Sequence, residues 1–495
     1  MKKPTAYQQL EERFSAITAL RQQRNLLEFD VMTGHADPAP LATLSAHLHE
    51  ELTQPEIGGH LRCSWKNYLN LNIWQRANLK IMAHWHNSAI ALPATFCAER
   101  DQATQESFAG WVQARAANNF ARALPGLQAL VELKRVEARL LSHTLKLEPY
   151  DALISQHEPR LTSRQYDRLF TALDTQLPWL TDRIKTRQTN KIPLTPQVMA
   201  TLAQQGEIAR RIAGYMQLDP ARLELRAGPH AACYGALRMV RISYPAAATD
   251  PLKPVLDMVH ESGHALYRQH LPQSWHHQPV GQISGTLMDE AVALACENQI
   301  GRSATFARWL SPHLTDVYGD DPAFSPANLH QTFNQMGSHL LRVAADEVSY
   351  PQHILLRYQL EKDLISGQLA VADLPHAFNH AMTRRLGLSP AHDNEGCLQD
   401  PHWFGGYFGY FPGYLGGQLA AAQFGLTAQR PQHRAHGDVD IEQLTSWMDR
   451  RLWRYGAQTP TANRIASATG QPLTTQAFTK RLTRNYLAPI TRKFV

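Results

Sequence analysis

Residues 260–264 read His260-Glu261-Ser262-Gly263-His264, an HExxH pentad. An α-helix turns about 100° per residue, so residues four apart share a face, one turn apart. Two imidazoles at this spacing can reach one divalent ion, and Glu261 lies beside the first of them. The pentad therefore predicts a helix that carries a metal site.

The residues around the pentad favour that helix. Pro251 and Pro254 suit a first helical turn, and Pro272 ends the run. Apolar side chains recur between them at helical spacing: Val255, Leu256, Val259, Leu266 and Tyr267. A chance pentad is the alternative interpretation, because the chain contains 24 histidines.

Helical periodicity also dominates the rest of the chain, through the first 225 residues and again beyond 325. A clear example has Ser163 as N-cap, followed by Tyr166, Leu169, Phe170, Leu173 and Leu177. The strand signal is largely confined to the stretch before the pentad, where Val240, Ile242 and Tyr244 alternate with Arg241 and Ser243. We predict one mainly α-helical domain over 1–495, with an N-terminal helical portion at 1–225 and a metal-bearing portion at 226–495.

The pentad is typical of zinc hydrolases. A zinc ion lowers the pKa of a bound water to about 7, and a neighbouring glutamate takes its proton as the water attacks a carbonyl. Glu261 would be that general base. A third ligand should come from another helix and leave one position open for water.

Three downstream carboxylates are candidates for the third ligand: Asp289, Glu290 and Glu297, on a segment over 289–300 that we expect to be helical. Spacing alone does not choose among them. Glu297 could instead lie on a solvated helix face, and Asp289 could be a helix-start carboxylate near the positive end of the dipole.

The stretch 259–267, VHESGHALY, resembles the HExxHALY segment of the carboxypeptidase Taq family of metallocarboxypeptidases. In that family the third ligand is the Glu of an HESQ motif, followed by a stretch that ends in GRS. This chain has DEAV at 289–292 and GRS at 301–303. The resemblance therefore implies that Glu290 is the third ligand.

Two further motifs strengthen the resemblance. Residues 341–346, LRVAAD, resemble the family's IRxxAD, and residues 396–403, GCLQDPHW, match its GxxQDxHW and run on into GYFP at 409–412. The similarity covers nearly the whole chain. It implies a mainly α, zincin-like fold with a deep substrate cleft, a small β element near the metal, and a homodimer.

The resemblance also implies roles for the motif residues. Arg342 would grip the substrate's terminal carboxylate, which a planar guanidinium matches, although an internal ion pair with Asp346 is the alternative. His402 and Tyr410 would supply donors to the oxyanion of the tetrahedral intermediate. Without the family, these two residues would be interpreted as core or cleft-wall side chains.

Three more positions are assigned with alternatives left open. Gln399 is expected to bind substrate, and Asp400 could line the groove or orient a ligating imidazole, unless the two form a loop-capping pair. Arg241 keeps the centre of the family's DxRxT, which reads MVRIS at 239–243. It is expected to bind substrate, unless it is an ordinary strand arginine.

Some positions depart from the family. The HESQ motif has lost its His, Ser and Gln, and HPF has no clean counterpart around 228–231. Residues that orient metal ligands are worth about 10- to 100-fold in affinity or activity. We therefore expect a divergent member, in which either metal binding is weaker or Asp289 has a new role.

Length and composition suit a soluble enzyme. The chain has 495 residues, 43% of them hydrophobic and 19% charged, which is normal for a globular protein. The formal charge is +6 and the pI is about 9.0, but the basic residues are scattered. Local clusters at 450–454 and 480–493 lack a binding motif or stacking aromatics, so no nucleic-acid partner is expected.

Five cysteines without a CxxC pair indicate neither a disulfide framework nor a cysteine zinc site. Reduced thiols fit a cytoplasmic protein. The start, MKKP, leads into polar residues, which argues against a secretory signal, and no run has the length of a membrane span. We expect no membrane partner.

The sequence thus predicts a metal-dependent carboxypeptidase that acts on peptides with a free C-terminus. One divalent ion would be held by His260, His264 and Glu290, with zinc as the default and cobalt or manganese as substitutes. Two alternatives remain. One is another zincin peptidase, an endopeptidase or dipeptidase, and the other is a non-catalytic helical binding protein with a vestigial site.

Overall fold

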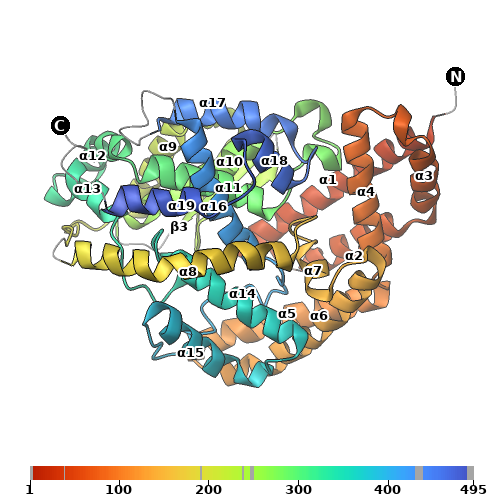
Figure 1. Ribbon diagram of the computed structural model, residues 1–495, viewed down its shortest axis with the longest axis horizontal. Coiled ribbons are helices and arrows are strands. Elements are labelled where there is room, and N and C mark those ends of the chain that lie inside the picture. The colour runs from red at the N-terminus through yellow and green to blue at the C-terminus, as the bar shows by residue number, and fades with distance from the viewer. Residues whose placement is uncertain are drawn as a thin grey trace. The chain divides into compact units, whose positions relative to one another are not determined.

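The computed structural model describes residues 4–37, 39–189, 192–236, 239–245, 250–429 and 439–487. The protein is mainly helical, as predicted, and its described strands form one three-stranded sheet (Figure 1). The chain divides into two compact units. Unit 1 comprises Met1–Arg13, Ala42–Thr175 and Met336–Leu415, and unit 2 comprises Phe14–Leu41, Gln176–Gln335 and Gly416–Val495. The predicted single domain and its cleft stay predictions.

Unit 1 is built from helices that bury apolar faces against one another. The helices that lie within it are α3 (Pro55–Lys66), α4 (Ile73–Ile90), α5 (Ala94–Ala117), α6 (Leu124–Leu145), α7 (Pro149–Ile154), α14 (Tyr350–Ser366) and α15 (Leu374–Leu386). α6 is the centre of the packing, because it contacts α4, α5, α7 and α14. Its side chains Leu127, Leu130 and Val131 are fully buried.

Unit 2 contains the sheet and the remaining helices. The helices that lie within it are α9 (Leu202–Tyr215), α10 (Lys253–Gln269), α11 (Thr286–Ala295), α12 (Ala304–Tyr318), α13 (Pro326–Phe333), α17 (Ile441–Arg451), α18 (Thr461–Thr469) and α19 (Gln476–Leu482). Four helices have residues in both units: α1 (Ala6–Met32), α2 (Ala39–Thr53), α8 (Ser163–Gln188) and α16 (Phe411–Ala428).

The sheet has the order β1-β3-β2, from β1 (Leu223–Gly228), β2 (Ala232–Ala236) and β3 (Met239–Pro245). β3 runs parallel to β1 and antiparallel to β2. The predicted strand is therefore confirmed. Val240 and Ile242 are fully buried, whereas Tyr244 is half-buried.

The predicted metal-bearing helix is α10. Pro254 lies in its first turn, Pro251 lies just before it, and the helix ends before Pro272. Val255 and Val259 are fully buried, and α10 packs against α11, β2 and β3 (Figure 1). The pentad thus lies on a helix that the rest of unit 2 surrounds.

Two glycines allow close approach around this helix. A Cβ at Gly263, inside the pentad, would lie 2.6 Å from Cα of Ala293 on α11. A Cβ at Gly417 on α16 would lie 2.6 Å from Cβ of Glu290. Neither position has room for a side chain. α11, and with it Glu290, can therefore pack directly against the pentad.

The segment predicted as helical over 289–300 is an α-helix only in part. α11 ends at Ala295 and continues as a π-helical turn, Cys296–Gly301, which carries Glu297. Such π-turns are rare and occur frequently at functional sites, and sequence periodicity does not predict them.

Two smaller observations complete the fold. α8 begins at Ser163, so the residue expected to be the N-cap is the first residue of the helix. The N–H of the preceding residue, Thr162, donates to Oε1 of Gln165 at 3.0 Å. Within the described ranges, no helix combines the length and the hydropathy that a membrane crossing requires.

Candidate functional site

The three predicted metal ligands meet in unit 2. Nε2 of His260 lies 3.7 Å from Oε2 of Glu290, and Nε2 of His264 lies 3.9 Å from Oε1 of the same carboxylate. One ligand atom from each of the three residues falls within 4.8 Å of the other two. Two histidines and one carboxylate at these distances match a metal site that keeps a position open for water.

Each imidazole is oriented by a second carboxylate. Nδ1 of His260 donates to Oε2 of Glu297 at 3.0 Å, and Nδ1 of His264 donates to Oδ1 of Asp289 at 2.8 Å. With the proton on Nδ1, the lone pair of each ring lies on Nε2, the atom that faces Glu290. Asp289 and Glu297, which spacing left as ligand candidates, thus orient the two histidines that are predicted to be ligands.

An arginine supports each of these carboxylates. Arg268 on α10 contacts both oxygens of Asp289, at 3.1 and 2.9 Å, and Arg302 contacts Glu297 at 2.6 Å. Burial raises the pKa of both carboxyls, but the arginines and imidazoles outweigh it. The pKa of Asp289 falls well below its usual range, and that of Glu297 falls to about 2. The solvated-face alternative for Glu297 is therefore wrong.

The charges of this cluster fit a divalent cation. Four carboxylates (Glu261, Asp289, Glu290 and Glu297) and two guanidiniums (Arg268 and Arg302) sum to −2 when both imidazoles are neutral. Burial lowers the pKa of His260, but the hydrogen bond to Glu297 and the charges of Glu261 and Glu290 raise it to about 10. Without an ion, the ring therefore carries a proton on each nitrogen, and an ion binds Nε2 by displacing the proton there.

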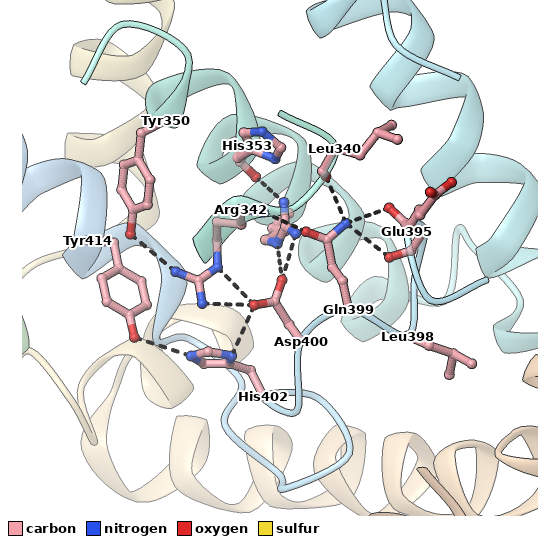
Figure 2. A network of polar contacts seen from close by, with 12 residues as sticks. Leu340, Arg342, Tyr350, His353, Glu395, Leu398, Gln399, Asp400, His402 and Tyr414 are labelled. Carbon is pink, nitrogen blue, oxygen red and sulfur yellow. Dashed lines mark hydrogen bonds and ion pairs between the residues drawn. The ribbon is translucent and has the colours of Figure 1, made fainter. Parts of the chain in front are cut away.

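Arg342 lies in unit 1, in a 3₁₀ turn over Arg342–Ala344, and is buried. Figure 2 shows its polar contacts. Its Nε and Nη2 both lie 2.8 Å from Oδ1 of Asp400, and Nη1 lies 3.4 Å from the Tyr350 hydroxyl. The alternative ion pair with Asp346 is wrong. Oδ1 of Asp346 accepts the N–H of Val348 at 2.8 Å instead.

Asp400 joins two arginines rather than a metal ligand. Its Oδ2 accepts from Nε of Arg357 at 2.6 Å, while Oδ1 is taken by Arg342. The idea that Asp400 orients a ligating imidazole is therefore wrong, because Asp289 and Glu297 perform that role. Both arginines hold the pKa of Asp400 far below its usual range, although burial opposes them.

Gln399 contacts the backbone around Arg342. Its Oε1 accepts the N–H of Arg342 at 2.8 Å, and its Nε2 donates to the carbonyls of Glu395 and Gly396 at 2.7 and 3.1 Å (Figure 2). These are the contacts of the loop-capping alternative. A direct role in substrate binding stays a prediction.

His402 and Tyr410 lie in an aromatic cluster of unit 1. Nε2 of His402 lies 3.2 Å from the Tyr414 hydroxyl, and the rings of His402 and Tyr410 are 5.8 Å apart. Burial and the charge of Arg342 lower the pKa of His402 to about 3. The imidazole is therefore neutral near pH 7, and a neutral ring can still donate one N–H hydrogen bond.

Arg241 lies on β3 of unit 2. Its Nε contacts Glu224 at 2.8 Å and its Nη1 contacts Asp30 at 2.8 Å. Two internal ion pairs are typical of the alternative, an ordinary strand arginine. Substrate binding by Arg241 stays a prediction.

Glu361 on α14 anchors the segment 402–410 of unit 1. Its Oε1 accepts from the Tyr150 hydroxyl at 2.7 Å and from the N–H of Gly409 at 2.5 Å, and its Oε2 accepts from the indole N–H of Trp403 at 2.8 Å. Burial raises the pKa of this carboxyl to about 7, although the three hydrogen bonds oppose the rise.

Sequence reasoning missed four of these residues. Arg268 lies four residues after His264, a spacing that could have indicated a contact across one helical turn. Arg302 lies in the GRS stretch, beyond a π-turn that no local rule anticipates. Arg357 and Glu361 gave no local signal, because the side chains of Asp400 and Trp403, which they contact, lie more than 40 residues away.

A mainly helical fold with an HExxH helix and a carboxylate ligand from the next helix defines a metallopeptidase of the HExxH class. The family model of carboxypeptidase Taq (M32) metallopeptidases matches residues 9–486. The thermostable carboxypeptidases 1 of Thermus thermophilus and Pyrococcus furiosus are 30% and 28% identical, with 92% and 90% of both chains covered. Trypanosoma cruzi metallocarboxypeptidase 1 superimposes with a TM-score of 0.92 at 30% identity, over 98% of this chain and 99% of the other.

The chain therefore belongs to the carboxypeptidase Taq (M32) family. It is a metal-dependent carboxypeptidase, a hydrolase that cleaves the C-terminal peptide bond of peptides, as the sequence predicted. A family of metallopeptidases implies a divalent ion, and the donor set of His260, His264 and Glu290 suits one.

We predict that Asp289→Asn lowers metal affinity about 10- to 100-fold, because the uncharged amide holds His264 less firmly. Competition with a chelator measures the change. Asp316→Asn removes a carboxylate that is 66% exposed in the same unit, so it is the matched control. Equal affinity in Asp289→Asn and the wild type would contradict the role of Asp289.

The pKa of Glu361 predicts pH-dependent stability. The carboxyl titrates near 4.5 when unfolded and near 7 when folded, so the folded state binds more protons between these values. The free energy of unfolding should therefore fall as pH rises through this window, by about 3 kcal/mol at about 1.4 kcal/mol per pKa unit, and then level off.

Urea unfolding of the wild type and Glu361→Gln, measured from about pH 4 to about pH 8, tests this prediction. The difference in unfolding free energy between the two proteins should change across the window. Glu132→Gln, at a side chain that is 61% exposed in the same unit, controls for the loss of a carboxylate. A difference that stays constant with pH would refute the assignment.

Proposed function

We propose that His260, His264 and Glu290 hold the catalytic ion and that Glu261 is the general base. The observation that carries the proposal is the orientation of the two rings: each Nδ1 is bonded to a carboxylate and each Nε2 faces Glu290. A divalent ion supplies Lewis-acid chemistry, because it lowers the pKa of water and polarises a carbonyl.

Glu261 then accepts the proton of the attacking water and passes it to the leaving amine. It follows His260 directly on α10 and is 8% exposed, so it is largely shielded from bulk solvent. His402 and Tyr410 donate hydrogen bonds to the oxyanion that develops on the scissile carbonyl. The lowered pKa of His402 keeps the ring neutral, and a neutral imidazole can still donate one N–H hydrogen bond.

Arg342 binds the terminal carboxylate of the peptide, which restricts cleavage to the last residue. Its Nη1 is the donor that the structure leaves least engaged, since the Tyr350 hydroxyl lies 3.4 Å away. Gln399 supports this arginine through its backbone N–H. Substrate binding by Arg241 is carried over from the family resemblance, while its two carboxylate partners are those of an ordinary strand arginine.

Zinc is the ion that we propose, since two imidazoles and one carboxylate form its usual catalytic ligand set, with cobalt or manganese as substitutes. The family match over 9–486 supports a single functional domain. We expect a homodimer from the family resemblance. We expect a cytoplasmic location because none of the five cysteines forms a disulfide.

We predict that Glu261→Gln lowers kcat by about 10²- to 10⁴-fold, the usual contribution of a general base, and leaves the metal content unchanged. Mass spectrometry of a peptide mixture should show stepwise loss of C-terminal residues with the wild type only. A chelator should abolish the wild-type activity. Activity that persists in Glu261→Gln would contradict the assignment, and activity that resists the chelator would contradict the metal site.

We predict that Arg342→Met lowers kcat/KM for peptides with a free C-terminus by about 10- to 150-fold, as expected for hydrogen bonds to a charged group. A matched peptide with an amidated C-terminus is the control, because it lacks the carboxylate. Equal cleavage of acid and amide by the wild type would indicate an endopeptidase. An equal loss on both peptides would indicate a structural role for Arg342.

A further inference from the structure

Asp400 is shared by two arginines that reach it from different elements, and Figure 2 labels one of them, Arg342. Arg342 directs both Nε and Nη2 at Oδ1, each at 2.8 Å. Arg357, on α14, directs Nε and Nη2 at Oδ2, each at 2.6 Å. Each guanidinium thus contacts one oxygen of Asp400. Neither arginine forms a bidentate pair, in which one guanidinium contacts both oxygens of a carboxylate.

Both arginines are shielded from water. Arg357 is 1% exposed, its Nη1 donates to the carbonyl of His353 at 2.8 Å, and its guanidinium lies 5.2 Å from the ring of Phe378. Burial lowers the pKa of Arg357, and the charge of Arg342 adds to this effect, although Asp400 opposes it. Two like charges are therefore held close together around one carboxylate.

The cluster of Arg342, Arg357, Asp400, His353 and His402 carries one net positive charge. The guanidiniums contribute two positive charges and Asp400 one negative charge. The imidazoles add none, because burial and a neighbouring arginine lower the pKa of each ring to about 3. A buried charge in excess is unfavourable until an ion of opposite sign binds beside it.

We propose that Arg357 is a specificity-determining positioning residue that holds Asp400 by one oxygen and so keeps one positive charge at Arg342 for the substrate's terminal carboxylate. The proposal rests on the assignment of Arg342 to that carboxylate. If Arg357 were neutral, Asp400 could turn both oxygens toward Arg342. The cluster would then have no net charge, and the carboxylate would gain little from binding there.

Arg357→Gln tests the charge because glutamine keeps a hydrogen-bond donor. We expect KM for peptides with a free C-terminus to rise about 10- to 100-fold, as loss of a unit charge at short range predicts, with a smaller effect on kcat. Inhibition by 3-phenylpropanoate, a monocarboxylate without a peptide bond, should weaken by a similar factor. Arg357→Lys keeps the charge but not the geometry of the guanidinium, so it should weaken inhibition less than Arg357→Gln does.

A double variant separates charge from packing. Arg357→Gln combined with Asp400→Asn restores one net positive charge, because both groups become neutral and Arg342 remains. We expect this variant to recover most of the inhibition by 3-phenylpropanoate that Arg357→Gln loses. A role of Arg357 in packing alone would not be rescued by a second substitution.

Lys362→Met is the matched control on the same helix, where Lys362 pairs with Asp167 at 2.9 Å near the surface. It should leave inhibition by 3-phenylpropanoate unchanged. Arg342→Gln separates this proposal from the one on which it rests. If Arg342→Gln weakens inhibition and Arg357→Gln does not, the role of Arg357 is overturned and that of Arg342 stands. If neither weakens it, both assignments fail.

If Arg357→Gln does not fold, Asp400→Asn tests the same effect of charge, with the opposite change in inhibition expected. It adds one positive charge to the cluster, so 3-phenylpropanoate should bind more tightly than to the wild type. Unchanged or weaker inhibition by this variant would overturn the proposal. Near-ultraviolet circular dichroism establishes that each variant is folded.

Discussion

The proposed metal centre depends on two hydrogen bonds, from Nδ1 of His260 to Glu297 and from Nδ1 of His264 to Asp289. They fix which ring nitrogen carries the proton, and so direct both lone pairs at the position that Glu290 also faces. The rest of unit 2 maintains them. Gly263 lets α10 and α11 approach closely. The π-turn places Glu297 beside the ring of His260.

The two groups of functional residues, one in each unit, carry opposite net charges. The metal centre sums to −2 with neutral imidazoles, and the cluster around Asp400 sums to +1. Buried charge is unfavourable without a counter-ion, so each group is completed by a ligand of opposite sign. A divalent ion completes the first, and a single carboxylate fits the second. In the roles that we propose, the same electrostatic rule accounts for binding of the metal and for recognition of a free C-terminus.

The departure from the family at position 289 also has a physical explanation. The aspartate there accepts from His264 and from Arg268, so the substitution supplies an orienting carboxylate rather than removing one. The sequence left open whether metal binding is weaker or Asp289 has a new role. The contacts favour the second possibility, because an oriented imidazole is a better ligand.

The sequence by itself determined what local periodicity and motif spacing encode: the helix of the pentad, the strand at β3 and the mainly helical fold. The family resemblance also predicted Glu290 as the third ligand, and its carboxylate lies 3.7 and 3.9 Å from the two rings. Only the tertiary structure decided the partners of Arg342 and Asp400, which lie 58 residues apart, and the π-turn beneath Glu297. The reason is that buried ion pairs are chosen by which side chains meet in the folded core, and no local spacing encodes that meeting.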